Sequence, residues 1–199
     1  MESTDKSKLN EYKRKRDFSK TTEPSGSNKK DGEMPRFVIQ KHDATNLHYD
    51  FRLETDGILK SWTIPKGPTT HPSEKRLAIL TEDHPTDYID FEGSIPKDQY
   101  GGGTVIVWDG GTYRNLRKEK EGDGLSLAES FDDGKVEVWL EGKKLKGGYV
   151  LIRTGKKDSD QWLFIKMKDD EVDARRNPIN TESKSILSGK TIEEIKKEV

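Results

Sequence analysis

The sequence contains no cysteine, few hydrophobic residues and no long apolar run. Without cysteine, the 199-residue chain cannot form disulfide bonds, thiolate metal sites or a cysteine nucleophile, so any metal must be bound through nitrogen and oxygen. No segment approaches the roughly 20 apolar residues that a membrane-spanning helix needs. The first thirty residues also lack the apolar stretch of a signal peptide. We therefore expect a cytoplasmic protein without membrane contacts.

Hydrophobic residues make up only 29% of the chain and charged residues 37%, yet the net charge is −1. Domains that bind nucleic acid by bulk electrostatics are usually strongly basic, so this balance favours a local basic site at most. The apolar residues are scarcest near the two ends of the chain. We predict a polar, partly flexible N-terminal arm (1–33), one domain (34–168) and a polar tail (169–199). Thr191 and Glu194 would cap a short helix in that tail.

Short apolar or alternating runs, separated by turn residues, fill the central domain. A period of two is typical of strands, and Thr55-Asp56-Gly57 predicts a hairpin. Residues 126–133 predict one short helix. The pattern is mainly β and predicts an antiparallel barrel or sandwich. The runs predicted as strands are Arg36–Lys41, Leu47–Glu54, Ile58–Ile64, Leu77–Thr81, Tyr88–Phe91, Thr104–Trp108, Val136–Leu140, Tyr149–Arg153 and Trp162–Met167.

The densest chemistry lies in residues 40–53. If residues 47–53 form a strand, His48, Asp50 and Arg52 share one face and the apolar residues between them share the other. A turn could fold the preceding strand back and bring His42 to the same place. Two imidazoles and a carboxylate suit Mn²⁺, Zn²⁺ or Fe²⁺, and the planar guanidinium suits a phosphate. Alternating polar residues are also typical of the solvated face of an ordinary strand.

Other residues could support such a site. His84 follows a predicted strand, where a loop could bring it to the cluster, although a loop histidine is more often exposed. Lys66, between two prolines, and Arg76 are candidate anion contacts, with solvated side chains as the simpler interpretation. The glycines at 101–103 lack the order and context of a phosphate-binding P-loop, so they favour a tight turn into the next strand.

These motifs resemble the 3′-phosphoesterase module of the bacterial end-joining enzyme DNA ligase D and its free-standing relatives. The matching motifs are Arg36-Phe37-Val38-Ile39-Gln40-Lys41-His42-Asp43-Ala44, Leu47-His48-Tyr49-Asp50-Phe51-Arg52-Leu53-Glu54, Ser61-Trp62, Pro65-Lys66-Gly67-Pro68, Glu82-Asp83-His84-Pro85, Phe91-Glu92-Gly93-Ser94-Ile95-Pro96 and Tyr100-Gly101-Gly102-Gly103. The resemblance implies a compact antiparallel β-barrel with short flanking helices. It also implies a Mn²⁺-dependent enzyme that removes a 3′-terminal ribonucleoside from DNA and then hydrolyses the remaining 3′-phosphate to a 3′-hydroxyl.

The resemblance also implies residue roles, carried over by position in the motifs. The implied ligands of Mn²⁺, or of Co²⁺ or Zn²⁺, are His42, His48 and Asp50. The implied catalytic residues are Arg52, His84 and Tyr88. The implied phosphate or substrate contacts are Arg52, His84, Lys66, Arg76 and Glu82. An arm motif needed mainly for ribonucleoside removal is implied at Arg16, Asp17 and Glu23.

The implied substrates are primer-template DNA 3′ ends that carry a terminal ribonucleotide or a 3′-phosphate. No ligase motif is present, so we expect a free-standing enzyme or a single domain taken from a longer one, with joining left to a separate DNA ligase and end-joining proteins. Two alternatives remain open. His48, Asp50 and His84 also match the two-histidine, one-carboxylate triad of a non-haem iron oxygenase. A non-catalytic barrel could instead bind nucleic-acid ends through the basic stretches 114–120 and 143–146.

Overall fold

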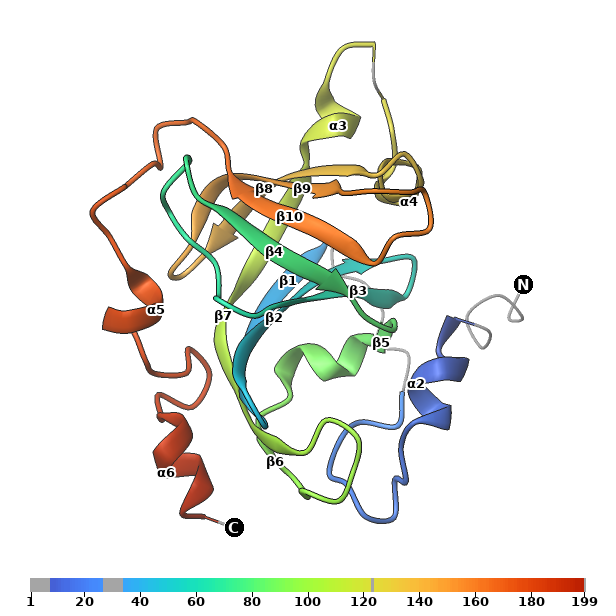
Figure 1. The fold of residues 1–199 in the computed structure, drawn as a ribbon, viewed down its shortest axis with the longest axis vertical. Coiled ribbons are helices and arrows are strands. Elements are labelled where there is room, and N and C mark those ends of the chain that lie inside the picture. Colours follow the sequence, from blue (N-terminus) through green and yellow to red (C-terminus); the bar gives the residue numbers. More distant parts are fainter. Residues whose placement is uncertain (1–7, 27–33, 123, 199) are drawn as a thin grey trace.

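Antiparallel strands form the body of the protein. The computed structural model describes residues 8–26, 34–122 and 124–198. In this part of the chain, eight strands pair in the order β1-β2-β3-β4-β10-β9-β8-β7, and β7 returns to β1, so that the sheet closes into a barrel (Figure 1). The barrel strands are β1 (Arg36–Asp43), β2 (Leu47–Thr55), β3 (Ile58–Ile64), β4 (Lys75–Leu80), β7 (Gly103–Asn115), β8 (Lys135–Gly142), β9 (Lys146–Arg153) and β10 (Gln161–Lys166). The expected mainly β, antiparallel barrel fold is confirmed.

Two short strands and several short helices flank the barrel. Strand β5 (His84–Pro85) pairs with β3, and β6 (Gly93–Ile95) pairs with β7. The helices are α2 (Asn10–Arg14), the 3₁₀ helix η1 (Thr86–Asp90), α3 (Leu116–Glu119), α4 (Leu127–Asp132), α5 (Pro178–Thr181) and α6 (Ile192–Lys196). None of the helices in the described ranges has the length and apolar character needed to cross a membrane.

Local sequence signals account for the turn and the two capped helices. Asp56 and Gly57 have φ angles of 48° and 75°, which is the pair of positive values that a type I′ hairpin turn requires. Helix α4 begins with a capping box between Ser126 and Glu129. Helix α6 begins with the predicted box, in which the Thr191 side chain accepts from the backbone of Glu194.

Two strand predictions were wrong in part. Residues 86–90 form the 3₁₀ helix η1 instead of the strand predicted at 88–91. A buried glutamine, Gln40, donates to the backbone carbonyls of Tyr88 and Phe91, so hydrogen bonds that a strand would need are used by a side chain. The strand predicted at 104–108 continues to residue 115, through Gly111, where a Cβ atom would lie 2.1 Å from the Glu141 carbonyl oxygen. The glycine there permits close strand packing and does not end the strand.

The barrel interior holds one large apolar cluster, and a second cluster lies outside it. The interior cluster is centred on aromatic side chains of facing strands, among them Phe51, Trp62, Trp162 and Phe164. The second cluster covers the outer face of β1 and β7 with side chains from η1, β6 and α2. Both faces of these strands are therefore buried. Polar residues on the outer face are shielded from water, and each needs a hydrogen-bond or charge partner.

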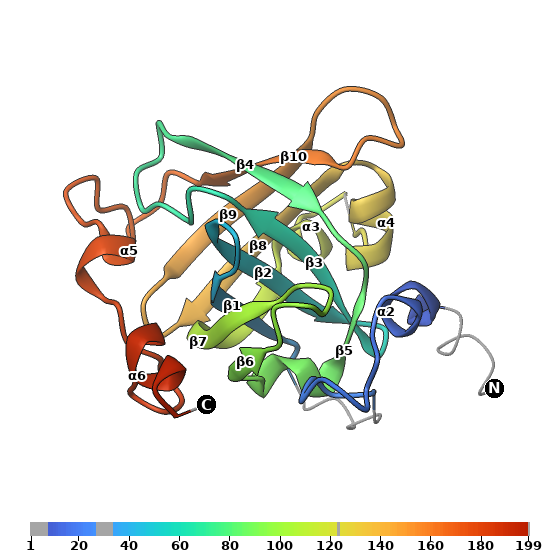
Figure 2. The ribbon, with the colours of Figure 1, turned by 60° about the horizontal axis from the view of Figure 1, so that its bottom comes forward.

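The two ends of the described chain pack on the outside of the barrel. Residues 8–26 lie beside η1 and β5, with Tyr12 fully buried (Figure 2). The segment after β10 runs along β7, where the Trp108 indole donates to the Glu182 carbonyl over 2.6 Å. Helix α6 then packs Ile192 and Ile195 against Ile106. Residues outside the predicted domain thus contribute to the packed structure around the barrel.

Candidate active site

The polar face of β2 points away from the barrel interior yet is buried. Asp50 is 7% exposed and Arg52 3% exposed, whereas a solvated strand face would leave both in water. Residues 8–26 of the N-terminal arm, β5 and η1 cover this face and leave a cavity of about 320 Å³ above it. A buried carboxylate and guanidinium need partners, so the arrangement indicates a built polar site.

Three side chains at one end of the cavity form a candidate metal centre. Within the described ranges, His42, His48 and Asp50 are the group whose ligand atoms all lie within 4.8 Å of one another. The antiparallel register places His42 directly opposite His48 on β1 and β2, and Asp50 follows two residues later on the same face. The carboxylate Oδ2 lies 3.6 Å from His42 Nδ1 and 3.7 Å from His48 Nε2.

The histidine rings fit a metal. His48 Nδ1 lies 2.8 Å from the Asn46 carbonyl oxygen, to which it donates, so the other ring nitrogen keeps its lone pair toward Asp50. The Nε2 atom of His42 is buried without a hydrogen-bond partner among the described residues. Two imidazole nitrogens and one carboxylate oxygen match the preference of Mn²⁺, Zn²⁺ and related ions for mixed nitrogen and oxygen ligands.

Asp50 is held as an anion. Burial by itself would raise the pKa of its carboxyl group, but the Arg52 guanidinium and the two imidazoles outweigh burial and hold that pKa below its usual range. Arg52 Nη2 donates to Oδ2 over 3.3 Å, and the Thr63 hydroxyl donates to Oδ1 over 2.6 Å. Both carboxylate oxygens are therefore oriented before any ligand arrives.

Arg52 is fixed from the other side by Gln40. The Gln40 amide oxygen accepts from Arg52 Nε over 2.7 Å, while its nitrogen donates to two backbone carbonyls at η1. The guanidinium also lies over the Tyr88 ring, 5.0 Å from its centroid. These contacts direct the remaining donors of Arg52 toward the cavity, where a phosphate could accept two parallel hydrogen bonds.

His84 lies next to two arginines and is uncharged. Burial, together with the charges of Arg52 and Arg16, lowers the pKa of its imidazole well below the usual value. Its Nδ1 lies 2.9 Å from the Glu82 carbonyl oxygen, which can only accept, and 3.1 Å from Arg52 Nη1, which can only donate. We assign the proton to Nδ1, where it points to the carbonyl oxygen. Its Nε2, 3.4 Å from Arg16 Nη2, then accepts a hydrogen bond from that guanidinium.

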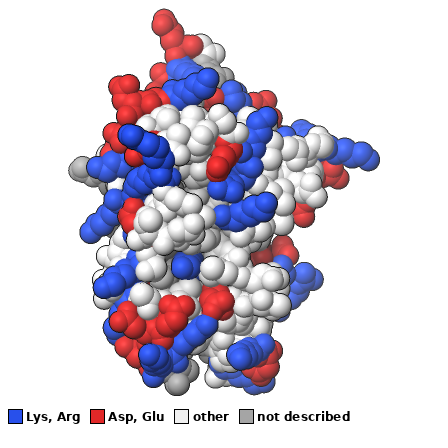
Figure 3. All heavy atoms as spheres, turned by 60° about the vertical axis from the view of Figure 1, so that its left-hand side comes forward, with Lys and Arg blue, Asp and Glu red and all other residues white. Residues whose placement is uncertain are grey.

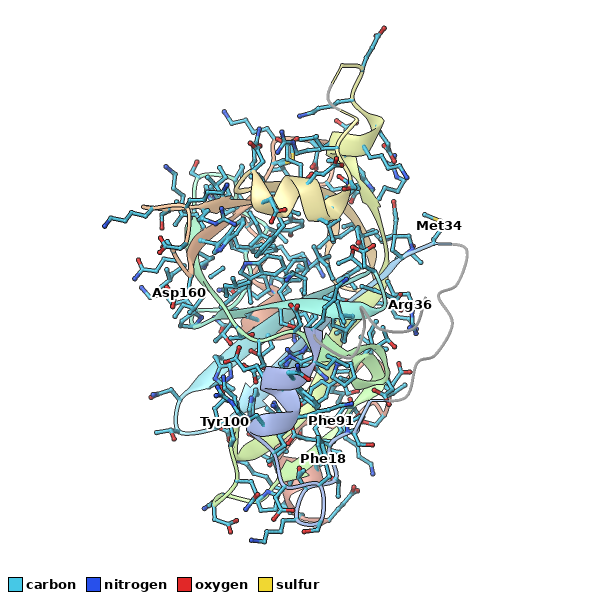
Figure 4. All side chains as sticks on the ribbon, turned by 90° about the vertical axis from the view of Figure 1, so that its right-hand side faces the viewer. Phe18, Met34, Arg36, Phe91, Tyr100 and Asp160 are labelled. Atoms are coloured by element: carbon cyan, nitrogen blue, oxygen red, sulfur yellow. The ribbon has the colours of Figure 1, made fainter. Side chains whose placement is uncertain are left out.

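Residues 8–26 close the cavity with charged contacts. Arg16 donates to Glu23 over 2.9 Å and to Glu82 over 3.1 Å, and its guanidinium lies 3.9 Å from the centroid of the Tyr12 ring. Glu23 also accepts a hydrogen bond from the Tyr88 hydroxyl over 3.0 Å. Figure 4 looks onto α2, with the site's Tyr100 to one side of the helix. The arm is thus part of the wall of the site.

Comparison of the sequence with known proteins identifies the family of this chain. A model of the DNA ligase D 3′-phosphoesterase domain matches residues 40–153, more than half of the chain. The chain belongs to this family. The multifunctional non-homologous end joining protein LigD of Pseudomonas aeruginosa is 48% identical over 189 residues, which cover 92% of this chain and 22% of that protein.

Relatives in mycobacteria show the same partial coverage. The multifunctional non-homologous end joining DNA repair protein LigD of Mycobacterium tuberculosis is 45% identical over 162 residues, 81% of this chain and 20% of that protein. The LigD protein of Mycolicibacterium smegmatis is 44% identical over 168 residues, 81% of this chain and 21% of that protein. The chain therefore spans about a fifth of the length of these LigD relatives.

The structure brings most of the residues implied by the family motifs into one cavity. Those that line it are Arg16, Glu23, His42, His48, Asp50, Arg52, Glu82, His84 and Tyr88. Three do not line it. Lys66 is exposed in the turn after β3, Arg76 donates to Glu74 over 2.6 Å, and Asp17 accepts from Ser19 in the turn after α2. A tight pairing of Asp17 with its own turn indicates a role in the shape of the arm.

Sequence reasoning did not assign two residues that contact the site directly. Gln40 lies two positions before His42, so strand alternation places both on the same face. Thr63 lies opposite Asp50 in the β2–β3 register. The first could have been found from the period of two, whereas the second required the register between two strands.

Proposed function

We propose that this protein is a metal-dependent DNA 3′-end-healing phosphoesterase. It would first remove a 3′-terminal ribonucleoside and leave a 3′-phosphate, and would then hydrolyse that phosphate to a 3′-hydroxyl. The observation that carries the proposal is the placement of His42, His48 and Asp50 beside Arg52 in one cavity. Membership of the 3′-phosphoesterase family supports it. Because the second step starts from the product of the first, one phosphate site can serve both.

The metal in this proposal is Mn²⁺, with Co²⁺ and Zn²⁺ as substitutes. His42, His48 and Asp50 would hold it. A bound ion of this kind acts as a Lewis acid on a phosphate oxygen. The three side chains supply one negative charge in total, so the ion would keep a net positive charge toward a phosphate.

The proposed task of Arg52 is to bind the equatorial oxygens of the phosphate. Its guanidinium is already oriented by Gln40 and Asp50, so little reorganisation is needed when charge develops on those oxygens. Removal of this preorganised cation would leave the developing charge without its nearest fixed donor. The cost of losing one such donor is typically about 10²–10³ in rate.

We propose that His84 takes up a proton when the substrate binds. The sequence-based expectation required a protonated imidazole, but in the free protein the ring is neutral because of burial and two neighbouring arginines. A phosphate dianion between Arg52 and Arg16 would offset their charges, so His84 would take up a proton as substrate binds. The imidazolium could then donate a proton to the leaving oxygen.

The N-terminal arm is proposed to serve mainly ribonucleoside removal. Arg16 and Glu23 are held in the wall of the cavity by Tyr88 and Glu82. A terminal ribonucleoside is larger than a terminal phosphate and would extend toward this wall. The 2′-hydroxyl, which distinguishes RNA from DNA, offers both a donor and an acceptor to such charged groups.

The two alternatives are less well supported. In the proposed oxygenase triad His84 would replace His42, yet His84 contacts arginines on both ring nitrogens and lies outside the three-residue ligand group found in the described ranges. An iron ligand beside two guanidiniums is electrostatically unfavourable. The arginines instead fit an anionic substrate.

A barrel that only binds nucleic-acid ends would need free basic stretches. Lys120 pairs with Glu137, and Arg114 donates to Glu119 over 2.8 Å. Lys144 is buried and donates to backbone carbonyls of the C-terminal segment. Figure 3 shows one face of the molecule on which basic and acidic side chains are interspersed. These stretches thus offer a weak electrostatic track for a strand.

The decisive experiment is incubation with a labelled primer-template that ends in one ribonucleotide, with and without Mn²⁺. The proposal requires stepwise conversion to a 3′-phosphate and then to a 3′-hydroxyl, and loss of both steps in Asp50→Ala. Binding without any product would favour the end-binding barrel. A reaction that needs O₂ and Fe²⁺ and leaves the primer intact would favour the oxygenase. Joining of the healed end is assigned to a separate DNA ligase and end-joining proteins, whose addition should yield ligated product.

A further inference from the structure

A second, larger hollow lies beside the metal cluster. It has a volume of about 810 Å³, compared with about 320 Å³ for the cavity above Asp50. Its sides are the β1–β2 turn (43–45) and the segments 94–97 and 102–104 around β6 and the start of β7. Ala44 and Ile95 line both hollows, so the two spaces are neighbours. We call this second hollow the 43–104 groove.

A glycine at the start of β7 sets one wall of the groove. A Cβ atom on Gly103 would lie 2.4 Å from the Asp43 carbonyl oxygen and 2.8 Å from Ala44 Cα. Its φ of 145° is also rarely adopted by other residues. Nearby, the hydroxyl groups of Ser94 and Thr104 are 3.0 Å apart and join β6 to β7. The groove is therefore built by close backbone packing.

The C-terminal helix contributes a cation to the groove. Lys196 forms an ion pair with Asp43 at the groove wall, and its side chain is 46% exposed. Ile192, one turn earlier, and Ile195, the preceding residue, anchor the helix against Ile106. Figure 2 shows α6 beside β6 and the lower part of β7. A lysine more than 150 residues away in sequence is thus held next to the turn that follows His42.

The lining combines apolar surface with two lysines. Ala44, Ile95 and Pro96 provide apolar walls, and Lys97 and Lys196 provide positive charge. The volume lies in the range of about 300–1,000 Å³ that is usual for small-ligand sites. A nucleotide presents an apolar base face and a charged phosphate, which match these two kinds of surface. Asp43 also lines the groove and forms an ion pair with Lys196. The three charged side chains of the lining therefore carry a net charge of +1.

We propose that the 43–104 groove holds the nucleotide immediately upstream of the 3′ end on the strand that is processed. This inference rests on the proposed phosphoesterase function. A strand whose end reaches the metal cluster must leave the small cavity, and the groove adjoins that cavity at Ala44 and Ile95. Lys196 exchanges its partner Asp43 for a backbone phosphate. The two side chains are 46% and 30% exposed, and partly exposed ion pairs of this kind are weak. Lys97, which also lines the groove, contacts the same strand.

Binding is tested without metal and without turnover. Fluorescence anisotropy would measure the affinity of a labelled single-stranded DNA with a 3′-phosphate for the wild type and for Lys97→Ala/Lys196→Ala. We expect the double variant to bind the DNA at least about tenfold more weakly than the wild type. The slope of log affinity against log salt concentration should also be smaller in magnitude by about one to two. Lys197→Ala is the matched control, since Lys197 is exposed at the end of the same helix and does not line the groove. Equal affinity of wild type and double variant overturns the proposal.

Turnover separates this groove from the proposed function itself. With Mn²⁺, the double variant should show a raised KM for the oligonucleotide and an unchanged kcat. A nucleoside 3′-monophosphate, which occupies the small cavity alone, should be hydrolysed equally by both proteins. Thr45→Trp, which fills the groove from the exposed turn, should reproduce the selective loss. If the wild type releases no phosphate from any substrate, the proposed function fails, and the anisotropy result still decides whether the groove binds a strand.

Discussion

The hydroxyl group of Tyr88 donates a hydrogen bond to Glu23 Oε1 over 3.0 Å, which connects η1 to the N-terminal arm. Burial and the neighbouring carboxylate raise the pKa of the Tyr88 phenol well above its usual value, so the group stays a donor. Glu23 also accepts from Arg16 and from Thr21, and its side chain is almost completely buried. A buried carboxylate with three donors is a strong attachment point for the arm.

Tyr88→Phe should loosen the arm. A hydrogen bond to a charged group contributes about 1.5–3 kcal/mol, so the variant should unfold at a lower temperature. The arm carries Lys13, Lys15 and Arg16, and their release should speed cleavage by trypsin at these positions. Limited proteolysis with mass spectrometry would measure that rate. Tyr100→Phe is the comparison variant, since its exposed hydroxyl makes only long contacts, 3.3 Å to Lys15 of the arm and 3.5 Å to Glu82, and should loosen the arm less. Equal cleavage of Tyr88→Phe and wild type would contradict a role for this bond.

Metal binding should depend on the anionic state of Asp50. Asp50→Asn keeps the size of the side chain but removes the charge that faces both imidazoles, and we expect a loss of Mn²⁺ affinity of at least about 100-fold. Isothermal titration calorimetry would measure it. Asp56→Asn is a matched control, because Asp56 lies in the hairpin turn with a positive φ that asparagine tolerates. Unchanged affinity in Asp50→Asn would refute the metal centre.

Asp50→Asn should also destabilise the metal-free protein, because the Asp50 carboxylate compensates the charge of Arg52. Asp50 accepts from Arg52, which is 3% exposed, so loss of the carboxylate charge leaves a buried cation less compensated. Breaking a buried ion pair from one side typically costs about 3–5 kcal/mol. Circular dichroism of the metal-free protein should therefore show a lower unfolding temperature for Asp50→Asn than for wild type. A fold check of this kind is needed before lost metal affinity is interpreted.

Thr63→Val tests a contact that lies behind the ligands. The hydroxyl of Thr63 donates to Asp50 Oδ1 over 2.6 Å and fixes the carboxylate plane. Partners of this kind typically change metal affinity by about 10–100-fold. Thr63→Ser keeps the hydroxyl and should restore most of the affinity, whereas Thr63→Val should not. If both variants bind Mn²⁺ like wild type, orientation by Thr63 has no part in the site.

His84 should make stability and ligand binding depend on pH. Its pKa in the folded protein is lowered below the ordinary value of 6.5, while the unfolded chain keeps that value. As pH falls below about 6.5, the unfolded state takes up a proton that the folded state refuses, so the free energy of unfolding decreases with falling pH. His84→Asn should flatten this dependence, since the amide keeps a donor toward the Glu82 carbonyl and does not titrate.

Phosphate should shift the titration of His84 in the opposite direction. Arg16 and Arg52 are the cations that face the ring, with Glu82 and Glu23 behind them. An anion that neutralises the arginines should raise the pKa of His84, and proton NMR can follow the ring signals because the chain has only four histidines. A pKa that is the same with and without inorganic phosphate would contradict the proposed proton uptake.

The sequence predicted the elements that depend on local chemistry. Alternation along β2 placed His48, Asp50 and Arg52 on one face, and the hairpin at Asp56-Gly57 and the capping box at Thr191 followed from residue type. What it could not supply was the burial of that face, because the cover comes from η1 and from residues 8–26, which are remote in sequence. The apolar run at 88–91 predicts a strand, but most of it lies in η1, because two of its carbonyls are bound by Gln40, which is remote in sequence.

Long-range packing also determines whether the predicted anion contacts reach the cavity. Arg76 lies in a strand, as Arg52 does, and Lys66 lies in the turn after β3, but neither lines the cavity. Which face a residue at a strand end occupies depends on turns and on the barrel's curvature, which local patterns do not determine. By contrast, Lys196 lies in a segment that looked like a polar tail, yet Ile192 and Ile195 fix it beside Asp43.

Gln40 should act as a positioning residue for Arg52. Its amide oxygen accepts from Arg52 Nε, and its amide nitrogen donates to the carbonyls of Tyr88 and Phe91, so one side chain ties the arginine to η1. Gln40→Ala frees the guanidinium to adopt other orientations. We expect kcat for 3′-phosphate hydrolysis to fall by about 10–100-fold with a smaller change in KM, since misorientation weakens contacts that matter most in the transition state.

Two substitutions separate this positioning role from simple loss of packing. Gln40→Met keeps the volume of the side chain but no hydrogen bonds, and it should lose activity like the alanine variant while retaining more stability. Gln40→Glu keeps the acceptor for Arg52 but loses the donors to η1, and should recover part of kcat because the guanidinium remains oriented. Thermal unfolding would be measured in parallel for all three. If kcat follows the unfolding temperature across the series, Gln40 only supports the fold; if it follows the acceptor, the amide oxygen orients Arg52 for the phosphate.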